Sequence, residues 1–400
     1  MVALVPIRKP AKGIPRPLRP NLRGLTRSQL ETFVASKLAA PRFRADQIFE
    51  WIHRHRVQDV DEMANIPKAL RLLITEHGDL RRLERHGDFV ARDGTRKLRL
   101  RTLDGYFIES VLIPNDQRGF TLCVSSQVGC SMTCRFCATA SLPFERNLAA
   151  WEIVDQVEQA QDLLEQAWQI DEPQAQAAGD EERGAEPLPY RLSNVVYMGM
   201  GEPLHNFVPV KSSVDIVTDP KGAAITSRRI TISTSGLVPA IERFSKDPLS
   251  ERVGLAVSLN ATTDEVRDEV MPINLKWPIS DLLDAVRALP DTRRRDLTFE
   301  YVLLEEVNDF EDDAHRLADL VREFDCHINV IPFNPHAHAP YRRPSSTRVH
   351  HFMTVAKRRG LRVYLRTPRG DDIGAACGQL ALEGERGRVE RNDNVEKIKT

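Results

Sequence analysis

An α/β protein built around a largely parallel sheet is the fold that the sequence predicts. Short apolar runs such as "NVVYMGM", "RRITIST" and "VGLAVSLN" alternate along the chain with helical patterns such as "PISDLLDAVRAL". Strand runs separated by helices imply βαβ units, in which neighbouring strands are parallel. About six such units can be traced, fewer than a full eight-stranded barrel requires, which leaves a partial barrel or an open doubly wound sheet.

The chain before this region has a different pattern. After Thr26 or Ser28, either of which can cap a helix, "LETFVASKL" places apolar residues at helical spacing, and "FRADQIFEWIHRHR" does so again. We therefore expect residues 26–88 to form a small helical accessory domain. Its aromatic and basic residues suit contact with RNA, although Phe49 and Trp51 are residue types that more often fill a core.

A β-hairpin is expected next, because the strand-like runs "KLRLRT" and "YFIESVLIP" flank the turn signal "LDG". It occupies residues 89–118 and links the helical domain to a main domain at 119–382. Within the main domain, residues 169–189 are rich in Gln, Ala, Glu and Pro and have no periodic apolar face, so a disordered insertion is predicted there. Residues 383–400 are predicted to be a frayed C-terminal tail.

The first residues of the chain, 1–25, are basic and rich in proline, and they are predicted to be disordered. No acidic residue precedes Glu31, whereas arginines and lysines recur from Arg8 onward. Such a tail either neutralises phosphates of a nucleic acid or is simply solvated, and composition supports both readings equally. A mitochondrial transit peptide is disfavoured, because the prolines would break its amphipathic helix.

The overall composition is that of an ordinary soluble protein, with a formal net charge of −1, 41% apolar and 28% charged residues. The sequence contains no apolar run of about eighteen residues, and Pro6 and Arg8 interrupt the apolar start "MVALVPI". We expect a cytoplasmic protein with no membrane partner. Four of the six cysteines lie between Cys123 and Cys137, which favours metal or redox chemistry over a disulfide framework.

Three cysteines, Cys130, Cys134 and Cys137, form a C-x₃-C-x₂-C run after the first strand of the βα series, where α/β enzymes carry their sites. A structural zinc site is closed by four ligands, and a cluster of four irons also needs four. Three cysteines therefore leave one position for a ligand that is not protein, which indicates a reactive cluster. The alternative is zinc, with the fourth ligand drawn from Cys123, Cys326, Cys377 or a distant histidine.

A second chemical motif, "MGMGEPLHN", follows the next strand. Gly199 and Gly201 allow the backbone to approach a ligand closely, and Glu202 can bind an amine. Because this turn ends the neighbouring strand, we expect it to form the floor for whatever completes the cysteine site.

Together these two motifs resemble the radical S-adenosylmethionine (SAM) superfamily. The resemblance extends, from about Glu109 to Leu380, to the RlmN/Cfr family of RNA methyltransferases. It is carried by "TLCVSSQVGCSMTCRFCATA", "VVYMGMGEPLHN", "ITISTSGLVPAI", "MPIN", "IPFNP" and "GDDIGAACGQL". It implies a partial (β/α)₆ radical SAM barrel at 119–382, in which SAM chelates the iron that the three cysteines leave open.

The resemblance also implies which residues hold the cofactors. Cys130, Cys134 and Cys137 would hold one 4Fe–4S cluster. The residues implied to contact SAM are Gly201, Glu202, Ser233, Ser258, Leu259, Asn260 and Asn334. The family usually has His where Asn260 stands, but an Asn side chain can also donate and accept hydrogen bonds.

Carbon 2 of adenine is neither acidic nor nucleophilic, so it cannot attack a SAM methyl group directly. By resemblance, one of two SAM molecules per turnover methylates Cys377, and the second yields a 5′-deoxyadenosyl radical that abstracts hydrogen from this methyl group. The resulting carbon radical adds to adenine, Glu109 or Cys123 removes the proton, and Cys123 releases the product by forming a disulfide with Cys377. Cys326 matches no family role, so we expect a buried thiol there.

The implied activity is methylation of adenosine carbon 2 in 23S rRNA, at the peptidyl transferase centre, and in tRNAs just 3′ of the anticodon. The implied state is a monomer that receives electrons from a ferredoxin or flavodoxin. One alternative is a Cfr-type enzyme acting on carbon 8 of the same rRNA adenosine, although Pro203 after Glu202 favours the carbon 2 branch. Another is a non-catalytic RNA-binding protein stabilised by zinc.

Overall fold

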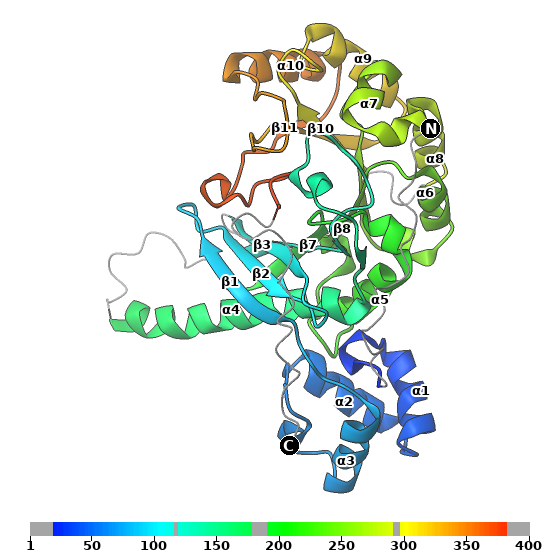
Figure 1. Ribbon diagram of the computed structural model, residues 1–400, viewed down its shortest axis with the longest axis vertical. Helices are drawn as coiled ribbons and strands as arrows, with labels where there is room; N and C mark the ends of the chain where they lie inside the picture. Colours follow the sequence, from blue (N-terminus) through cyan, green and yellow to red (C-terminus); the bar gives the residue numbers. More distant parts are fainter. Residues whose placement is uncertain (1–18, 116–118, 178–189, 291–296, 382–400) are drawn as a thin grey trace, which may run out of the picture.

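One long sheet runs through most of the molecule (Figure 1). The computed structural model describes residues 19–115, 119–177, 190–290 and 297–381. In these ranges ten strands pair in the order β1-β2-β3-β4-β7-β8-β9-β10-β11-β12, while β5 pairs with β6 separately. The strands are β1 Glu84–Val90, β2 Arg96–Arg101, β3 Phe107–Asn115, β4 Gly119–Cys123, β5 Gln127–Val128, β6 Arg146–Asn147, β7 Leu192–Tyr197, β8 Ile230–Thr234, β9 Gly254–Ser258, β10 Leu297–Leu303, β11 Cys326–Pro332 and β12 Val363–Leu365.

In the long sheet, each pairing from β4 through β7, β8, β9, β10 and β11 to β12 is parallel, and helices lie between successive strands. The helices are α1 Arg27–Lys37, α2 Phe43–His53, α3 Lys68–His77, α4 Ala150–Ala177, α5 Phe207–Thr218, α6 Val238–Ser245, α7 Asp264–Val270, α8 Ile279–Arg287, α9 Glu311–Val321 and α10 Ser346–Arg358. The predicted α/β fold is confirmed. Because the strands are parallel, their carboxyl ends lie along one edge of the sheet, where the candidate site is found.

The N-terminal helices α1, α2 and α3 gather at one end of the molecule, away from the upper part of the sheet (Figure 1). The first of them begins at Thr26, whose side chain accepts from the main chain of Gln29 in a capping box. Thr26, rather than Ser28, is therefore the cap. Phe49 is fully buried as expected of a core residue, and the Trp51 Nε1 donates to the Asn65 Oδ1 at 2.6 Å.

The predicted disordered tail is shorter than residues 1–25, because residues 19–25 have a defined structure. Leu22 and Arg23 are fully buried in a short 3₁₀ helix, Leu22–Gly24. Arg23 forms a buried ion pair with Glu158 of α4, and the Nδ1 of His53 lies 2.8 Å from the Glu158 Oε1. The sequence prediction failed here because it read Arg23 as one more solvated charge. Residues 1–18 lie outside the described residues.

The predicted hairpin is confirmed as β2 and β3, which pair antiparallel. A further strand, β1, pairs with β2 and begins at Glu84, inside the range predicted to be helical. Its side chains are nearly all exposed on both faces, so "ERHGDFV" lacks the alternation by which a strand is recognised. The domain limits at 88 and 118 remain predictions, but the helical part of 26–88 ends at His77.

The long helix α4 corrects a second prediction of disorder. It continues to Ala177, so residues 169–177 of the predicted insertion at 169–189 are helical. Figure 1 shows this part of α4 reaching beyond the sheet. Residues 178–189 and the predicted tail at 383–400 lie outside the described residues. Among the described helices, none has the length and apolar character needed to span a bilayer.

Candidate active site

The three motif cysteines lie in a loop, residues 129–137, that we call the cysteine loop. It begins at Gly129, which has a φ of +73°, and a Cβ there would lie 2.0 Å from the carbonyl oxygen of Pro143. Only glycine fits this position. Cys130, Cys134 and Cys137 are all free thiols and half-buried.

The three thiols influence one another electrostatically. Burial raises the pKa of Cys134 well above its ordinary value, and the charges of Cys137 and Cys130 raise it further. Burial also raises the pKa of Cys130 to about 12, with Cys137 as the next cause. Such mutual effects mean that the thiols lie near one another, where positive charge would stabilise their thiolates.

Thiolates alone, without carboxylate or imidazole, are the donor set of iron–sulfur clusters, in which each cysteine binds a different iron. Among the described residues, no three His, Cys, Asp or Glu side chains converge as ligands of a single ion do. The cysteine loop therefore carries the type of donor that an iron–sulfur cluster uses, and its role as the cluster site stays a prediction.

The glycine-rich turn, residues 198–202, packs directly on the start of the cysteine loop. The main-chain N–H groups of Ser126 and Gln127 donate to the carbonyl of Met200 at 2.8 and 3.2 Å. Gly201 has a φ of +106°, and a Cβ on it would lie 2.5 Å from the Gln127 Cβ. The two motifs that the sequence singled out separately are thus in contact.

Glu202 follows this turn and is buried. One carboxylate oxygen accepts from the main-chain N–H and the hydroxyl of Ser235, at 2.8 and 2.9 Å, and the other accepts from the Leu204 N–H at 3.2 Å. Burial raises the pKa of Glu202, which the hydrogen bonds from Ser235 partly oppose. The carboxylate is therefore fixed in orientation beside the cysteine loop.

Gln127 joins these two parts and was missed in the sequence. Its Oε1 accepts from the Glu202 N–H at 2.9 Å and from the Ser131 N–H at 3.2 Å, and its Nε2 donates to the Asn147 Oδ1 at 2.8 Å. A fully buried amide with these partners sets the spacing between the glycine-rich turn and the cysteine loop. Buried glutamines have no local signature, so the role appears only in three dimensions.

Three other predicted SAM contacts lie at the ends of β8 and β9. Ser233 donates through its hydroxyl to the Tyr197 carbonyl at 2.7 Å, which ties β8 to β7. Ser258 is the last residue of β9, and its side chain is half-buried. Leu259 follows it, is fully buried, and donates its N–H to the carbonyl of Glu300 at 3.1 Å.

The side chain of Asn260 already forms hydrogen bonds within the protein. Its Oδ1 accepts from the Val302 N–H at 2.8 Å, and its Nδ2 lies 3.1 Å from the Met271 sulfur. The residue has a φ of +56°, a conformation that Asn and His tolerate better than most side chains. This explains why Asn can stand where the family usually has His, and its contact with SAM stays a prediction.

Asn334, which follows β11, connects the cysteine Cys377 to the barrel edge. Its Nδ2 donates to the Cys377 carbonyl at 3.0 Å, and its Oδ1 accepts from Arg343 at 3.0 Å. The segment around Cys377 is also joined to the cysteine loop and the turn after it. The Ala138 N–H donates to the Gly378 carbonyl at 2.7 Å, and the Thr139 hydroxyl donates to the Leu380 carbonyl at 2.6 Å.

Cys377 and Cys123 both lie in segments at the carboxyl edge of the sheet. Cys123 ends β4 and is half-buried, and burial raises its pKa to about 12. The Cys377 residue is exposed, but its thiol is desolvated, and this desolvation, followed by the charges of Glu300, Cys123 and Cys137, raises the pKa of the thiol. The predicted methyl carrier therefore lies within electrostatic range of its predicted disulfide partner and of Cys137.

Glu109 lies on β3, beside this group, and is fully buried. Its carboxylate is 3.1 Å from the Arg99 guanidinium and 3.7 Å from the Lys97 ammonium, and its carbonyl accepts from the Ser125 hydroxyl at 2.5 Å. Lys97 also donates to the Gly374 carbonyl at 3.2 Å, close in sequence to Cys377. The predicted proton acceptor therefore has a fixed place, next to two cations.

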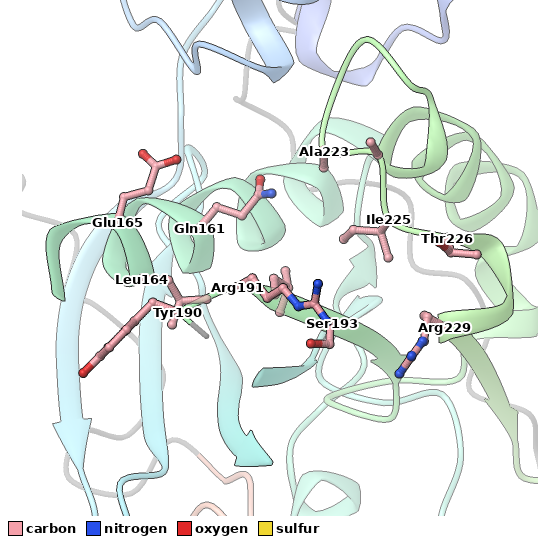
Figure 2. A pocket seen from close by; sticks show the side chains of 12 residues that line it. Gln161, Leu164, Glu165, Tyr190, Arg191, Ser193, Ala223, Ile225, Thr226 and Arg229 are labelled. Atoms are coloured by element: carbon pink, nitrogen blue, oxygen red, sulfur yellow. The ribbon is translucent and has the colours of Figure 1, made fainter. Parts of the chain in front are cut away.

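Cys326 and a cavity lined by residues of α4, β7 and the segment before β8 lie away from the site. Cys326 begins β11, at the opposite end of the strand from Asn334, and its expected burial is confirmed. A cavity of about 430 Å³ lies near the amino ends of β7 and β8, where Figure 2 shows the side chains of Arg191, Ser193 and Arg229. It is therefore at the other edge of the sheet from Cys123 and Glu202.

A solved structure has the same overall arrangement. The radical SAM methyltransferase from Sphaerobacter thermophilus matches this chain with a TM-score of 0.79 and 40% sequence identity, over 90% of this chain and 98% of that chain. The fold and the cysteine site thus define this chain as a radical SAM methyltransferase, and the predicted partial barrel is confirmed. Membership of this class implies SAM and an iron–sulfur cluster.

Sequence relatives identify the family within this class. Residues 20–78 match the family model "Ribosomal RNA large subunit methyltransferase N-terminal domain". The dual-specificity RNA methyltransferases RlmN of Dinoroseobacter shibae, Ruegeria pomeroyi and Paracoccus denitrificans are 42%, 43% and 43% identical to it. They cover 98%, 97% and 96% of this chain, and the same shares of their own lengths. The chain belongs to the RlmN family.

Proposed function

We propose that this enzyme methylates carbon 2 of adenosine in 23S rRNA and in tRNA through a methylated cysteine. The observation that carries the proposal is the attachment of the Cys377 segment to the cysteine loop region, through Gly378 and Leu380. A cysteine held beside the proposed cluster site could accept a methyl group from SAM and transfer it to adenine. The relatives of this chain in the RlmN family are dual-specificity RNA methyltransferases, which supports this proposal.

The cofactors in this proposal are one 4Fe–4S cluster and two molecules of SAM per turnover. Cys130, Cys134 and Cys137 hold the cluster. Gly201, Glu202, Ser233, Ser258, Leu259, Asn260 and Asn334 form the proposed SAM site. SAM supplies the methyl group and, after reductive cleavage, the radical chemistry that an unreactive ring carbon needs. The buried Glu202 carboxylate is well placed to receive the SAM amino group, because Ser235 fixes its orientation.

The protein residues divide the remaining work. Cys377 carries the methyl group to the adenine ring, which makes a covalent bond between protein and RNA. Glu109 or Cys123 then takes the proton from carbon 2, and the electron left on the adduct would return to the oxidised cluster. Cys123 attacks the sulfur of Cys377, so that a disulfide forms while the bond between this sulfur and the methylene carbon breaks. The released methylene group takes up a proton and becomes the methyl group of 2-methyladenosine. The shared electrostatic environment of the two thiols supports this pairing.

The proposed partners are 23S rRNA, tRNA and an electron donor of the ferredoxin or flavodoxin type, and the proposed state is a monomer. The helices α1, α2 and α3 are the proposed RNA-binding part, since residues 20–78 match a domain of ribosomal RNA methyltransferases. Arg42 and Arg54 are exposed there in ion pairs with Glu31 and Glu50, and such exposed pairs can exchange a carboxylate for a phosphate.

In vitro methylation of both RNAs, followed by mass spectrometry of the nucleosides, tests the proposal. Wild type should give 2-methyladenosine, Cys377→Ala should give none, and Cys326→Ala should match wild type because this thiol lies at the other end of its strand. An 8-methyladenosine product would instead show the Cfr-type activity. A colourless protein with one bound zinc after anaerobic reconstitution would show the non-catalytic alternative.

A further inference from the structure

Arg267, on α7, is a fully buried cation whose hydrogen-bond partners are all neutral. Its guanidinium donates to the carbonyls of Leu259 at 3.0 Å, Ser235 at 3.0 Å and Ser258 at 3.1 Å, and to the Asn274 Oδ1 at 2.9 Å. Among the described residues, no carboxylate forms an ion pair with it. It differs in this from Arg23, the other large buried arginine, which pairs with Glu158.

A buried charge of this kind is costly unless something negative offsets it. Desolvation lowers the pKa of Arg267 to about 10, so the side chain still carries its charge near neutral pH. Asp264 and Asp268, the two aspartates of its own helix that raise its pKa, are connected to it through Asn274, whose amide donates to them at 3.0 and 2.7 Å. A negative group in direct reach of the guanidinium would stabilise it further.

The cysteine loop packs against the end of α7. The Arg135 N–H donates to the Val270 carbonyl at 2.9 Å, and Cys134 packs against the apolar cluster that contains Val270 and Met271. The helix that carries the buried cation is therefore in direct contact with the loop that holds the proposed cluster.

We propose that Arg267 is the counter-charge of the iron–sulfur cluster, and that its guanidinium raises the reduction potential of the cluster. The inference rests on the proposed function, because it requires a cluster on Cys130, Cys134 and Cys137. Reduction adds one electron to a site that three thiolates already make negative. A fixed positive charge nearby stabilises the reduced form more than the oxidised form, and in a buried place this effect is large.

The same side chain is a positioning residue for SAM. Its three carbonyl acceptors belong to Ser235, which orients Glu202, and to Ser258 and Leu259, two of the proposed SAM contacts. Gly236 leaves room for this arrangement, since a Cβ on it would lie 2.8 Å from the Arg267 Nη2. Arg267 would therefore act in two ways: its charge stabilises the reduced cluster, and its hydrogen bonds hold three residues of the SAM site region in place.

The test separates charge from hydrogen bonding with four variants. Arg267→Met and Arg267→Gln remove the charge, Arg267→Lys keeps it, and Arg23→Met removes a fully buried arginine away from the cysteine loop. Each protein is reconstituted anaerobically with iron and sulfide, and its iron content is measured. The reduction potential is then determined by titration with dithionite, monitored by electron paramagnetic resonance, without SAM or RNA.

The neutral variants should show a shift to lower potential, while Arg267→Lys and Arg23→Met stay close to wild type. A neutral variant with full iron content and the wild-type potential would overturn the inference, as would a lysine variant shifted as far as the methionine variant. If the neutral variants cannot hold iron but the lysine variant can, the need for charge is supported. Loss of iron in all three would refute it. A wild type that assembles no cluster would instead refute the proposed function.

Discussion

The side-chain amide of Asn334 donates a hydrogen bond to the main-chain carbonyl of Cys377, at 3.0 Å. Asn334 lies at the end of β11, so this bond ties the exposed Cys377 to the rigid edge of the sheet. Arg343 in turn holds the Asn334 oxygen. A reactive thiol on a C-terminal segment is thereby kept near Cys123 and the cysteine loop, in a position set by the strands.

Replacing Asn334 with Asp should slow methylation of Cys377 by about fivefold, since loss of one positioning hydrogen bond costs about 1 kcal/mol. Asp keeps an acceptor for Arg343 but cannot donate to the Cys377 carbonyl. The measurement is the rate of single-turnover Cys377 methylation without RNA. The matched control is Asn329→Asp, on the same strand but bonded to Glu300. An Asn334→Asp enzyme as fast as wild type would show that this bond does not position the thiol.

Replacing Gln127 with Leu should weaken SAM binding by about tenfold without loss of iron. The change leaves the Glu202 N–H and the Asn147 side chain without partners in a buried place, at a cost of about 1–3 kcal/mol. Equilibrium dialysis with labelled SAM gives the affinity. Gln156→Leu is the control, because Gln156 is buried and bonds Ser125 but does not reach the glycine-rich turn. Equal affinity losses in both variants would mean a general structural effect.

Changing Glu109 to Gln should trap the protein on its RNA. Gln cannot accept the proton from carbon 2, so the covalent complex through Cys377 should accumulate on a denaturing gel while free methylated RNA falls at least tenfold. Gln also leaves Arg99 and Lys97 without their carboxylate, so the melting temperature should fall. The exposed Glu311→Gln serves as control. Free product at the wild-type rate from Glu109→Gln would assign proton transfer to Cys123.

Changing Glu158 to Gln should destabilise the contact between the N-terminal helices and α4. Removing the carboxylate leaves the fully buried Arg23 unpaired, which costs about 3–5 kcal/mol. Denaturant unfolding measures this loss. The iron content of the reconstituted protein should be unchanged, because the hydrogen-bond partners of the Glu158 carboxylate, Arg23 and His53, belong to the N-terminal region and not to the cysteine loop.

The same carboxylate predicts how stability depends on pH. Burial alone would raise the pKa of Glu158, but Arg23 and His53 outweigh it and lower the pKa below the usual value of 4.5. A lowered pKa contributes stability above the unfolded value, and this contribution is lost as the pH falls through the folded value. Acid unfolding below about pH 4.5 should therefore be steeper in wild type than in Glu158→Gln. If the stability of both proteins fell equally with pH, the lowered pKa would not belong to Glu158.

The sequence was sufficient for the parts that depend on periodicity and spacing. Alternating strands and helices predicted the parallel sheet, and the two motifs were placed correctly because parallel strands end at one edge. The capping signal at Thr26 was also readable, since Gln29 stands at the required distance.

What the sequence could not reveal are contacts between residues far apart. Arg23 in a basic, proline-rich stretch looks solvated, and only the fold shows Glu158 beside it. Strand β1 has no apolar face, since it is an edge strand exposed on both sides, and the sheet rather than its own pattern holds it. Gln127 and Arg267 belong to the site through partners that no local motif records.

The most direct test of the account is the chemical state of Cys377 itself. The reconstituted protein is incubated without RNA, with a reductant and SAM that carries a deuterated methyl group, and its peptides are analysed by mass spectrometry. The account predicts one labelled methyl group on the peptide containing Cys377, and none on those containing Cys123 or Cys326. An unmodified Cys377 at every time point, in a preparation that still transfers labelled methyl to RNA in a parallel incubation, would contradict it.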